Sequence, residues 1–216
     1  MIGYRQLWNL YYKMQKKEAG NMSENTITKR AIADSLKALT KTKTFDKISV
    51  KDISEQCGIN RQTFYYHFED KYTLLKWIYE SDLLSKYMND VNFDNWTTRL
   101  ESLLTAMTED KTFYINTVRH TENYIQEYLL VQAQDIFEQA INVIEESANA
   151  EGKKTVSKEQ RNFIARFFAY GSCGIIIEWV SRGMIEEPEY ISGNMKTLKD
   201  LCERASYDFL SDKLSI

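Results

Sequence analysis

Residues Thr44–Lys71, which read TFDKISVKDISEQCGINRQTFYYHFEDK, decide the fold of this chain. Ser49 is followed three positions later by Asp52, a spacing that predicts a capping box, with Asp in place of the usual Glu, and a helix that begins there. Gly58 stands where the end of that helix needs a residue with positive φ. Asn60 is a favourable N-cap for a second helix that starts immediately after it. The stretch therefore predicts two short helices joined by a tight, glycine-containing turn, which is a helix-turn-helix.

The second of these helices, Arg61–Phe68, carries side chains suited to reading DNA. Phe64 and Phe68 are four residues apart and form its buried side. In a helix-turn-helix the second helix lies in the major groove, with its first residues at the base edges. Arg61 can bind guanine O6 and N7 as a fork, and Gln62 can bind adenine N6 and N7. We expect contacts to phosphate from the free N–H groups that open the first helix and from the side chains of Ser49, Thr63, Tyr65, His67 and Lys71.

Helical patterns continue on both sides of this motif. Between Thr26 and Thr40, apolar residues recur every three or four positions, as in an amphipathic helix. Asp70 can cap a helix that runs without a glycine or proline to Tyr87. The whole chain has 1 proline and 8 glycines, which favours long helices over strands and turns. We therefore predict an all-α fold, with further helices at Trp96–Met107, Phe113–Val118, Asn123–Ser147, Ser157–Arg182 and Met195–Leu210.

Charge divides the chain into a basic first part and an acidic remainder. Residues 1–72 carry 13 Lys and Arg against 8 Asp and Glu, whereas residues 73–216 carry 15 against 23. This distribution suits a protein whose first part contacts DNA phosphate. We predict a helix-turn-helix DNA-binding domain over residues 23–72, linked by the helix 70–87 to a helical regulatory domain, for ligand binding and dimerisation, over residues 73–216.

Residues 1–22 form a separate segment without a clean helical pattern. The codons expected for Lys16–Glu18 are rich in purines and lie just upstream of Met22. One hypothesis is that this extra segment is a translated ribosome-binding site and that the natural protein starts at Met22. The alternative is a basic arm that contacts DNA.

Several classes of protein are disfavoured. No run of 18 apolar residues is present and the N-terminus lacks the apolar core of a signal peptide, so we expect no membrane span and no secretion. Cys57, Cys173 and Cys202 match neither a disulfide framework nor a zinc pattern, which favours a reducing cytoplasm. His67 and His120 are the only histidines, and no phosphate-binding, dinucleotide-binding or nucleophile motif occurs. We therefore expect no metal, no cofactor and no enzyme activity.

The helix-turn-helix also carries a family resemblance. Over residues 26–84, the pair Cys57 and Gly58, the aromatic run TFYYHF and the later pairs DK and LL follow the spacing of the N-terminal domain of TetR-family regulators. The resemblance implies a dimer, a ligand-responsive C-terminal domain and dimerisation through the last two helices. It also implies DNA contacts at Ser49, Val50, Arg61, Gln62, Thr63, Tyr65, Tyr66, His67 and Lys71.

A second stretch resembles one branch of that family. Phe167–Ser192, which reads FFAYGSCGIIIEWVSRGMIEEPEYIS, is similar to the branch that includes dihydroxyacetone-kinase regulators. Members of this branch act as repressors or, with a partner protein, as activators. The resemblance therefore implies control by a small molecule or by a partner protein.

Two further sets of residues have both a functional and a structural interpretation. The aromatic side chains of the C-terminal part either line a ligand cavity or form a core. The glycines within a predicted helix permit close packing, which is either between two subunits or within one chain. The predicted ligand-binding residues are Trp96, Phe113, Tyr114, Tyr124, Tyr128 and Phe167. The predicted dimer interface is Phe167, Gly171, Gly174, Ile175 and Trp179.

From these patterns we expect a cytoplasmic transcriptional regulator. It would be a repressor that binds a palindromic operator in double-stranded DNA as a homodimer, under the control of a small molecule or a partner regulator. The alternative is a protein-interaction module, or co-activator, that serves a partner regulator and binds little DNA of its own.

Overall fold

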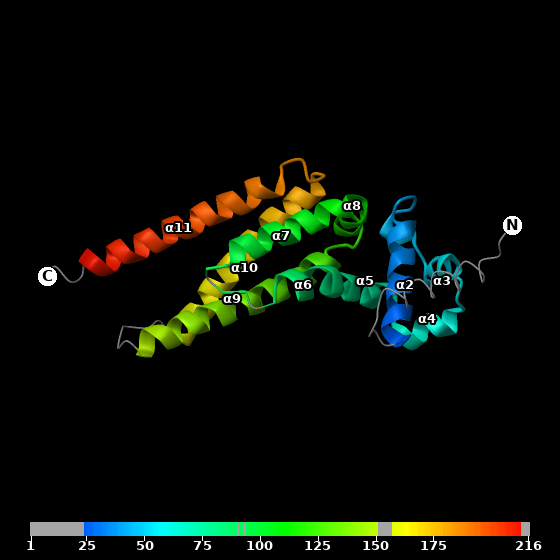
Figure 1. Cartoon of the computed structure of the whole chain (residues 1–216), viewed down its shortest axis with the longest axis horizontal. Coiled ribbons are helices and arrows are strands. Elements are labelled where there is room, and N and C mark those ends of the chain that lie inside the picture. The colour runs from blue at the N-terminus through cyan, green and yellow to red at the C-terminus, as the bar shows by residue number, and fades with distance from the viewer. Residues whose placement is uncertain (1–23, 90, 93, 151–156, 213–216) are drawn as a thin grey trace. The chain divides into compact units, whose positions relative to one another are not determined.

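The computed structural model describes residues 24–89, 91–92, 94–150 and 157–212 (Figure 1). Within these ranges all regular elements are helices, which confirms the predicted all-α fold. The predicted extra segment, residues 1–22, lies outside the described residues. In chain order the elements are α2 Glu24–Leu39, the 3₁₀ turn η1 Phe45–Lys47, α3 Val50–Cys57, α4 Arg61–His67, α5 Lys71–Tyr79, η2 Glu80–Leu84, α6 Ser85–Tyr87, α7 Trp96–Glu109, α8 Lys111–Arg119, α9 Tyr124–Ala150, α10 Lys158–Ser181 and α11 Pro188–Asp212.

These helices form two compact units, which we call the first and the second unit. In its described part the first unit comprises residues 24–82 and 112–125, and the second comprises the described parts of residues 83–111 and 126–216. α8 therefore groups with the N-terminal helices, although its place in the chain is within the predicted regulatory domain. The first unit also extends past the predicted border at residue 72 and includes α5.

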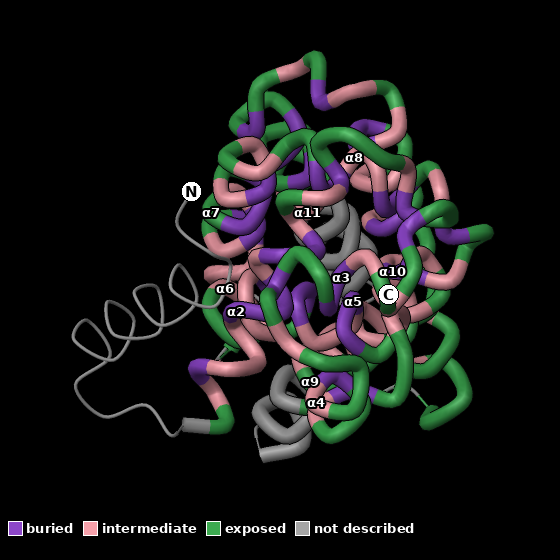
Figure 2. The backbone as a smooth tube through the Cα atoms, turned by 90° about the vertical axis from the view of Figure 1, so that its right-hand side faces the viewer, coloured by how far each residue is buried: buried purple, intermediate pink, exposed green. Residues whose placement is uncertain are grey.

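α2, α3 and α4 pack against one another in the first unit (blue and cyan in Figure 1). Ile32 and Leu36 of α2, Ile53 of α3 and Phe64 of α4 are fully buried. Buried positions alternate with exposed ones along the helices (Figure 2). Burial of each such side chain contributes about 1.5–3 kcal/mol to stability, so the amphipathic pattern of the sequence is what holds these three helices together.

The helix predicted to run regularly from Asp70 to Tyr87 contains a π-helical turn, η2, between α5 and α6. The prediction of a regular α-helix is therefore wrong at this point. In η2 the carboxylate of Asp82 forms ion pairs with Arg30 and with Lys37, the latter at 2.7 Å. Burial opposes ionisation of Asp82, but the two cations outweigh it and lower the pKa of this carboxyl. These ion pairs connect η2 to α2. They could not be predicted from the spacing of apolar residues within one helix, because the partners lie in another helix.

The second unit is held by contacts between its long helices. α7 packs along α11, where the hydroxyl of Ser192 donates to Glu101 Oε2 at 2.8 Å. α9 meets α10 through the stacked rings of Phe137 and Phe168. α11 begins at Pro188, earlier than predicted, because proline fits the first turn of a helix, where no intrahelical N–H donor is needed.

α10 is long and apolar enough to cross a membrane, by length and composition alone. The sequence prediction of no membrane span rested on a different criterion, the absence of 18 consecutive apolar residues, and it stays a prediction. One helix of this kind is weak evidence for a membrane span. Exposed apolar surface is also typical of a protein interface.

Candidate nucleic-acid interface

The structure confirms each predicted cap of the two short helices. At the start of α3 the side chain of Ser49 accepts from the backbone of Asp52, and the Asp52 carboxylate accepts from the backbone of Ser49, which completes the capping box. Gly58 ends α3 with a φ of 73°, in the left-handed region. Asn60 Oδ1 accepts a hydrogen bond of 2.7 Å from the N–H of Thr63 and so begins α4. These local bonds fix where each helix begins, and hence which side chains lie in its first turn.

The first turn of α4 presents two side chains suited to base recognition. Arg61 and Gln62 are exposed, and neither makes a side-chain hydrogen bond or ion pair with another described residue. On the other side of α4, Phe64 is fully buried and packs against Phe68, with ring centroids 6.0 Å apart. In the first turn of α3, Val50 is half-buried. The predicted base-reading residues therefore stand on the open face of a helix whose opposite face is fixed in the core.

The remaining predicted contacts of α4 differ in exposure. Tyr65 and Tyr66 are 55% and 80% exposed, and exposed aromatic rings with a polar end are typical of binding surfaces. His67 is half-buried, and its Nδ1 lies 3.2 Å from Asn25 Oδ1 of α2. Burial, followed by the charge of Lys29, lowers the pKa of His67. A neutral imidazole is therefore the form available to phosphate at neutral pH.

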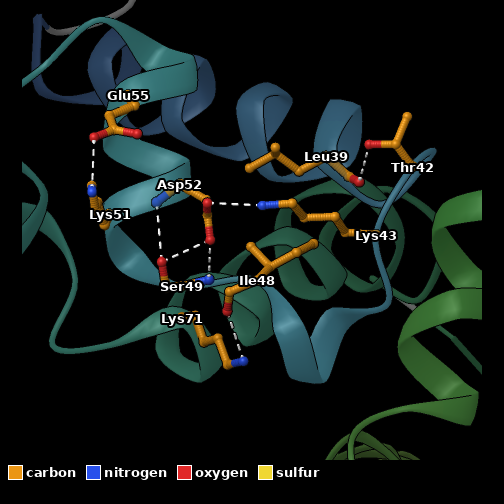
Figure 3. Close-up of polar contacts among 9 residues, drawn as sticks. All are labelled: Leu39, Thr42, Lys43, Ile48, Ser49, Lys51, Asp52, Glu55 and Lys71. Atoms are coloured by element: carbon orange, nitrogen blue, oxygen red, sulfur yellow. Dashed lines mark hydrogen bonds and ion pairs between the residues drawn. The ribbon is translucent and has the colours of Figure 1, made fainter.

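The hydroxyls of Ser49 and Thr63 are already engaged in helix caps. The Ser49 hydroxyl donates to Asp52 Oδ2 at 2.7 Å, and Lys43 Nζ donates to Asp52 Oδ1 at 2.9 Å (Figure 3). The bond from Lys43, followed by those from Ser49, holds the pKa of Asp52 well below its ordinary value. The Thr63 hydroxyl donates to Asn60 Oδ1 at 3.1 Å. Our sequence reasoning missed Lys43, because it lies in the link before α3, outside any helical spacing.

The ammonium of Lys71 is bound within the protein. Nζ donates to the carbonyl oxygens of Phe45, Asp46 and Ile48 at 2.9, 3.0 and 2.8 Å, and Figure 3 shows the last of these bonds. It also lies over the rings of Phe45 and Tyr72, and burial lowers the pKa of Lys71. An ammonium has three donors, so η1 and its flank take all of them. A contact of Lys71 with phosphate stays a prediction. The donor that Lys71 still has for such a contact is its backbone N–H, which lies in the first turn of α5 and has no intrahelical partner.

The predicted ligand-binding residues are not gathered into one unit. They divide into two sets, with Phe113, Tyr114 and Tyr124 in the first unit and Trp96, Tyr128 and Phe167 in the second. Phe113 and Tyr114 are buried against the ring of Tyr79. Both side chains therefore pack in the core of the first unit. Phe167 is 65% exposed, which fits a surface and not the lining of a cavity. A ligand-binding role of all six residues stays a prediction.

Four of the five predicted interface residues lie on an exposed stripe of α10. Phe167 and Ile175 are exposed apolar side chains. A Cβ atom placed on Gly171 or Gly174 would meet no described atom within 4 Å. The close packing that these glycines permit is therefore not used against the described residues, and a role in the dimer interface stays a prediction.

Trp179 is the exception and corrects the predicted interface. Only 2% of its surface is exposed, and its Nε1 donates to the carbonyl of Glu186 at 2.9 Å. The N–H of Met184 in turn donates to the Trp179 carbonyl at 2.8 Å. Trp179 thus belongs to the core of the second unit and holds the turn between α10 and α11, because its position in the helix faces the chain's own core.

No group of three or more His, Cys, Asp or Glu is arranged to hold a metal ion in the part of the chain that the structure describes. Cys57 and Cys173 are buried free thiols, and burial raises the pKa of each to about 11. A redox-active or metal-binding cysteine needs its thiolate form near neutral pH. The structure therefore gives these two cysteines a packing role.

The chain is similar to known bacterial regulators over most of its length. Residues 32–78 match the family described as "Bacterial regulatory proteins, tetR family", and residues 94–200 match "Transcriptional regulator C-terminal region". A curated relative, the HTH-type dhaKLM operon transcriptional activator DhaS of Lactococcus lactis subsp. lactis (strain IL1403), is 29% identical over 170 residues, which cover 79% of this chain and 88% of that protein. The solved structure of "Dihydroxyacetone kinase operon activator DhaS" has a TM-score of 0.62 and 27% identity, covering 81% of this chain and 94% of that one. The first matched segment contains α3 and α4, where the candidate interface lies.

Proposed function

Because the chain belongs to the TetR family of bacterial transcriptional regulators, and is therefore a regulator and not an enzyme, we propose that it binds operator DNA through the first turn of α4. One observation carries the proposal: Arg61 and Gln62 stand exposed in the first turn of a helix whose start is fixed by the Asn60 cap. Arg can bind guanine, and Gln adenine, through two hydrogen bonds each. The proposed DNA contacts are Ser49, Val50, Arg61, Gln62, Thr63, Tyr65, Tyr66, His67 and, through its backbone N–H, Lys71.

The proposal includes a homodimer that binds a pseudo-palindromic site. One helix-turn-helix spans one half-site, and a two-fold dimer reads two half-sites about one helical turn of DNA apart. The apolar stripe of α10 supports this arrangement, since Phe163, Phe167 and Ile175 are exposed and Gly171 leaves open space among them. Leu198 of α11 is exposed as well. Exposed apolar side chains in such number favour a partner surface, and a second copy of α10 and α11 would supply one.

Two candidate functions differ in the sign of regulation, that is, in whether the protein represses or activates transcription. From the sequence we expected a repressor controlled by a small molecule. The curated relative and the solved structure, which are both named DhaS, are called activators. This name favours, as the second candidate, an activator or co-activator that acts with a partner regulator. In either case we propose a cytoplasmic protein, since it must reach the bacterial chromosome.

Selection from a pool of random DNA duplexes tests the proposal. The full-length protein should enrich a sequence with two-fold symmetry, and its affinity for the recovered duplex should fall steeply with salt, by a log–log slope of about −0.9 for each phosphate contact. A matched variant, Arg61→Ala with Gln62→Ala, should keep the salt dependence but enrich no sequence. Failure of the wild type to enrich any sequence, with no salt-dependent binding to any duplex, would refute DNA binding and favour the protein-interaction alternative.

A further inference from the structure

Asn116 of α8 holds the backbone between α2 and η1. Its Nδ2 donates to the carbonyls of Thr40 and of Lys43, each at 2.8 Å, and its Oδ1 accepts from the N–H of Phe45, also at 2.8 Å. The partners are two acceptors and one donor, so only one orientation of the amide satisfies all three. One side chain thus binds both ends of the short link that leads out of α2.

Two of these three backbone groups, the carbonyl of Thr40 and the N–H of Phe45, belong to buried residues and need such a partner, whereas Lys43 is exposed. Thr40 follows the last residue of α2, and carbonyls at a helix end lack an intrahelical donor. Thr40 and Phe45 are both buried, and a buried backbone group without a hydrogen bond is strongly unfavourable. Without Asn116 the link would have to rearrange to bring these groups to water.

The same link sets the start of α3. It ends in η1, from which Ile48 leads directly to Ser49, the N-cap of α3 and a proposed phosphate contact. Lys71 Nζ holds the carbonyls of η1 and its flank, and Asn116 holds the part of the link before it. The two side chains come from two different helices, α5 and α8, and between them engage the backbone from Thr40 to Ile48.

We propose that Asn116 is a positioning residue for operator binding: it fixes the link between α2 and α3 so that the start of α3 is held ready for DNA phosphate. This inference rests on the proposed function. The preformed link raises affinity because the apparent dissociation constant rises as the fraction of binding-competent molecules falls.

Asn116 lies outside the helix-turn-helix segment of the sequence, although it contacts that part of the fold. It lies within residues 94–200, the part that matches the C-terminal region of transcriptional regulators, yet its side chain binds the first unit. The next residue, Thr117, is fully buried, and its Oγ1 lies 2.8 Å from the hydroxyl of Tyr79 in α5. Along the chain, only Asp110 separates α8 from α7 of the second unit. Asn116 therefore lies a few residues along the chain from the border between the two units.

The test compares two variants of the full-length protein at this position. Asn116→Ala removes all three hydrogen bonds. Asn116→Asp has nearly the same shape but loses both donors and sets a negative charge against two carbonyl oxygens. We expect each to bind the duplex selected by the wild type about tenfold more weakly, from a net loss typical of such hydrogen bonds. Hydrogen exchange at the Phe45 amide should accelerate in Asn116→Ala, because its acceptor is gone.

Two control variants separate positioning from general damage. Thr112→Ala changes an exposed residue of the same helix and should leave affinity and exchange unchanged. Ser192→Ala removes a hydrogen bond of the second unit and should lower the melting temperature without accelerating exchange at Phe45.

Three results bear against the inference in distinguishable ways. Wild-type affinity in Asn116→Asp would reduce Asn116 to a packing residue. Wild-type affinity in Asn116→Ala, with accelerated exchange at Phe45, would show that the link need not be ordered for binding. If the wild type itself selects no duplex, the proposed function fails, and this inference fails with it.

Discussion

Replacement of Lys71 by Met separates two roles that a lysine at this position can have. The variant keeps most of the apolar stem and removes the ammonium, and with it three hydrogen bonds to carbonyl oxygens at 2.8–3.0 Å. Hydrogen bonds that involve a charged group contribute roughly 1.5–3 kcal/mol each. Lys71 is only half-buried, so water replaces part of this loss. We expect the free energy of unfolding to fall by about 2 kcal/mol in total.

DNA binding by this variant should change in affinity but not in salt dependence. If the ammonium stays on the η1 carbonyls when DNA binds, it displaces no counterion from phosphate. Lys71→Met should then bind the selected duplex more weakly, since η1 is less ordered, with the same log–log slope against salt as the wild type. Urea unfolding and fluorescence anisotropy titrations at four or more salt concentrations measure the two quantities.

Lys47→Met is the matched control for Lys71→Met. Lys47 lies in η1 as well, is exposed, and has no comparable set of carbonyl partners, so its replacement should leave unfolding unchanged. The reasoning about Lys71 would be refuted if Lys71→Met unfolds as the wild type does and its salt slope falls by about 0.9. That result would show that the ammonium leaves the carbonyls and binds phosphate.

Three further predictions concern base recognition, assembly and thiol reactivity. Arg61→Ala should weaken operator binding by about 1–3 kcal/mol and relax the preference at one base pair of each half-site; unchanged affinity and selectivity in a competition titration would remove Arg61 as a base-reading residue. Phe167→Glu should convert the dimer to a folded monomer in sedimentation velocity, because the side chain is exposed in the single chain and a charge there opposes an apolar interface; a wild type that sediments as a monomer would contradict the proposed assembly. Cys57 and Cys173, each with a pKa of about 11, should resist alkylation by iodoacetamide at pH 8 and react readily in urea. Peptide mass spectrometry measures the labelling of each thiol. Rapid labelling of either in the native protein would contradict its burial.

The helix-turn-helix was predictable because its determinants are local. Ser49 and Asp52 cap α3 from three residues apart, Gly58 ends it with its own φ, and Asn60 caps α4 through the N–H of Thr63. Each of these bonds joins groups within three positions of each other, so the residue types at that spacing are sufficient to predict it. The spacing of Phe64 and Phe68 predicted the buried side of α4, and therefore that Arg61 lies on another face.

Side chains with distant partners were beyond the reach of periodicity and spacing. Lys71 binds carbonyls that lie 23 to 26 positions earlier, so its sequence position predicted a phosphate contact and gave no sign of these bonds. Asn116 lies more than 70 positions from the backbone that it holds, and α8 groups with the first unit although the chain order assigns it to the second.

The sequence alone thus determined the capped helices and the residues that α4 exposes, because these depend on groups a few positions apart. The tertiary structure decided which side of α10 Trp179 occupies, since helices with apolar residues on several faces do not reveal which face turns inward. It also decided that Asn116 and Lys71 hold the link before α3. Contacts of that kind form only when the helices have packed, because packing alone brings together groups that the chain keeps far apart.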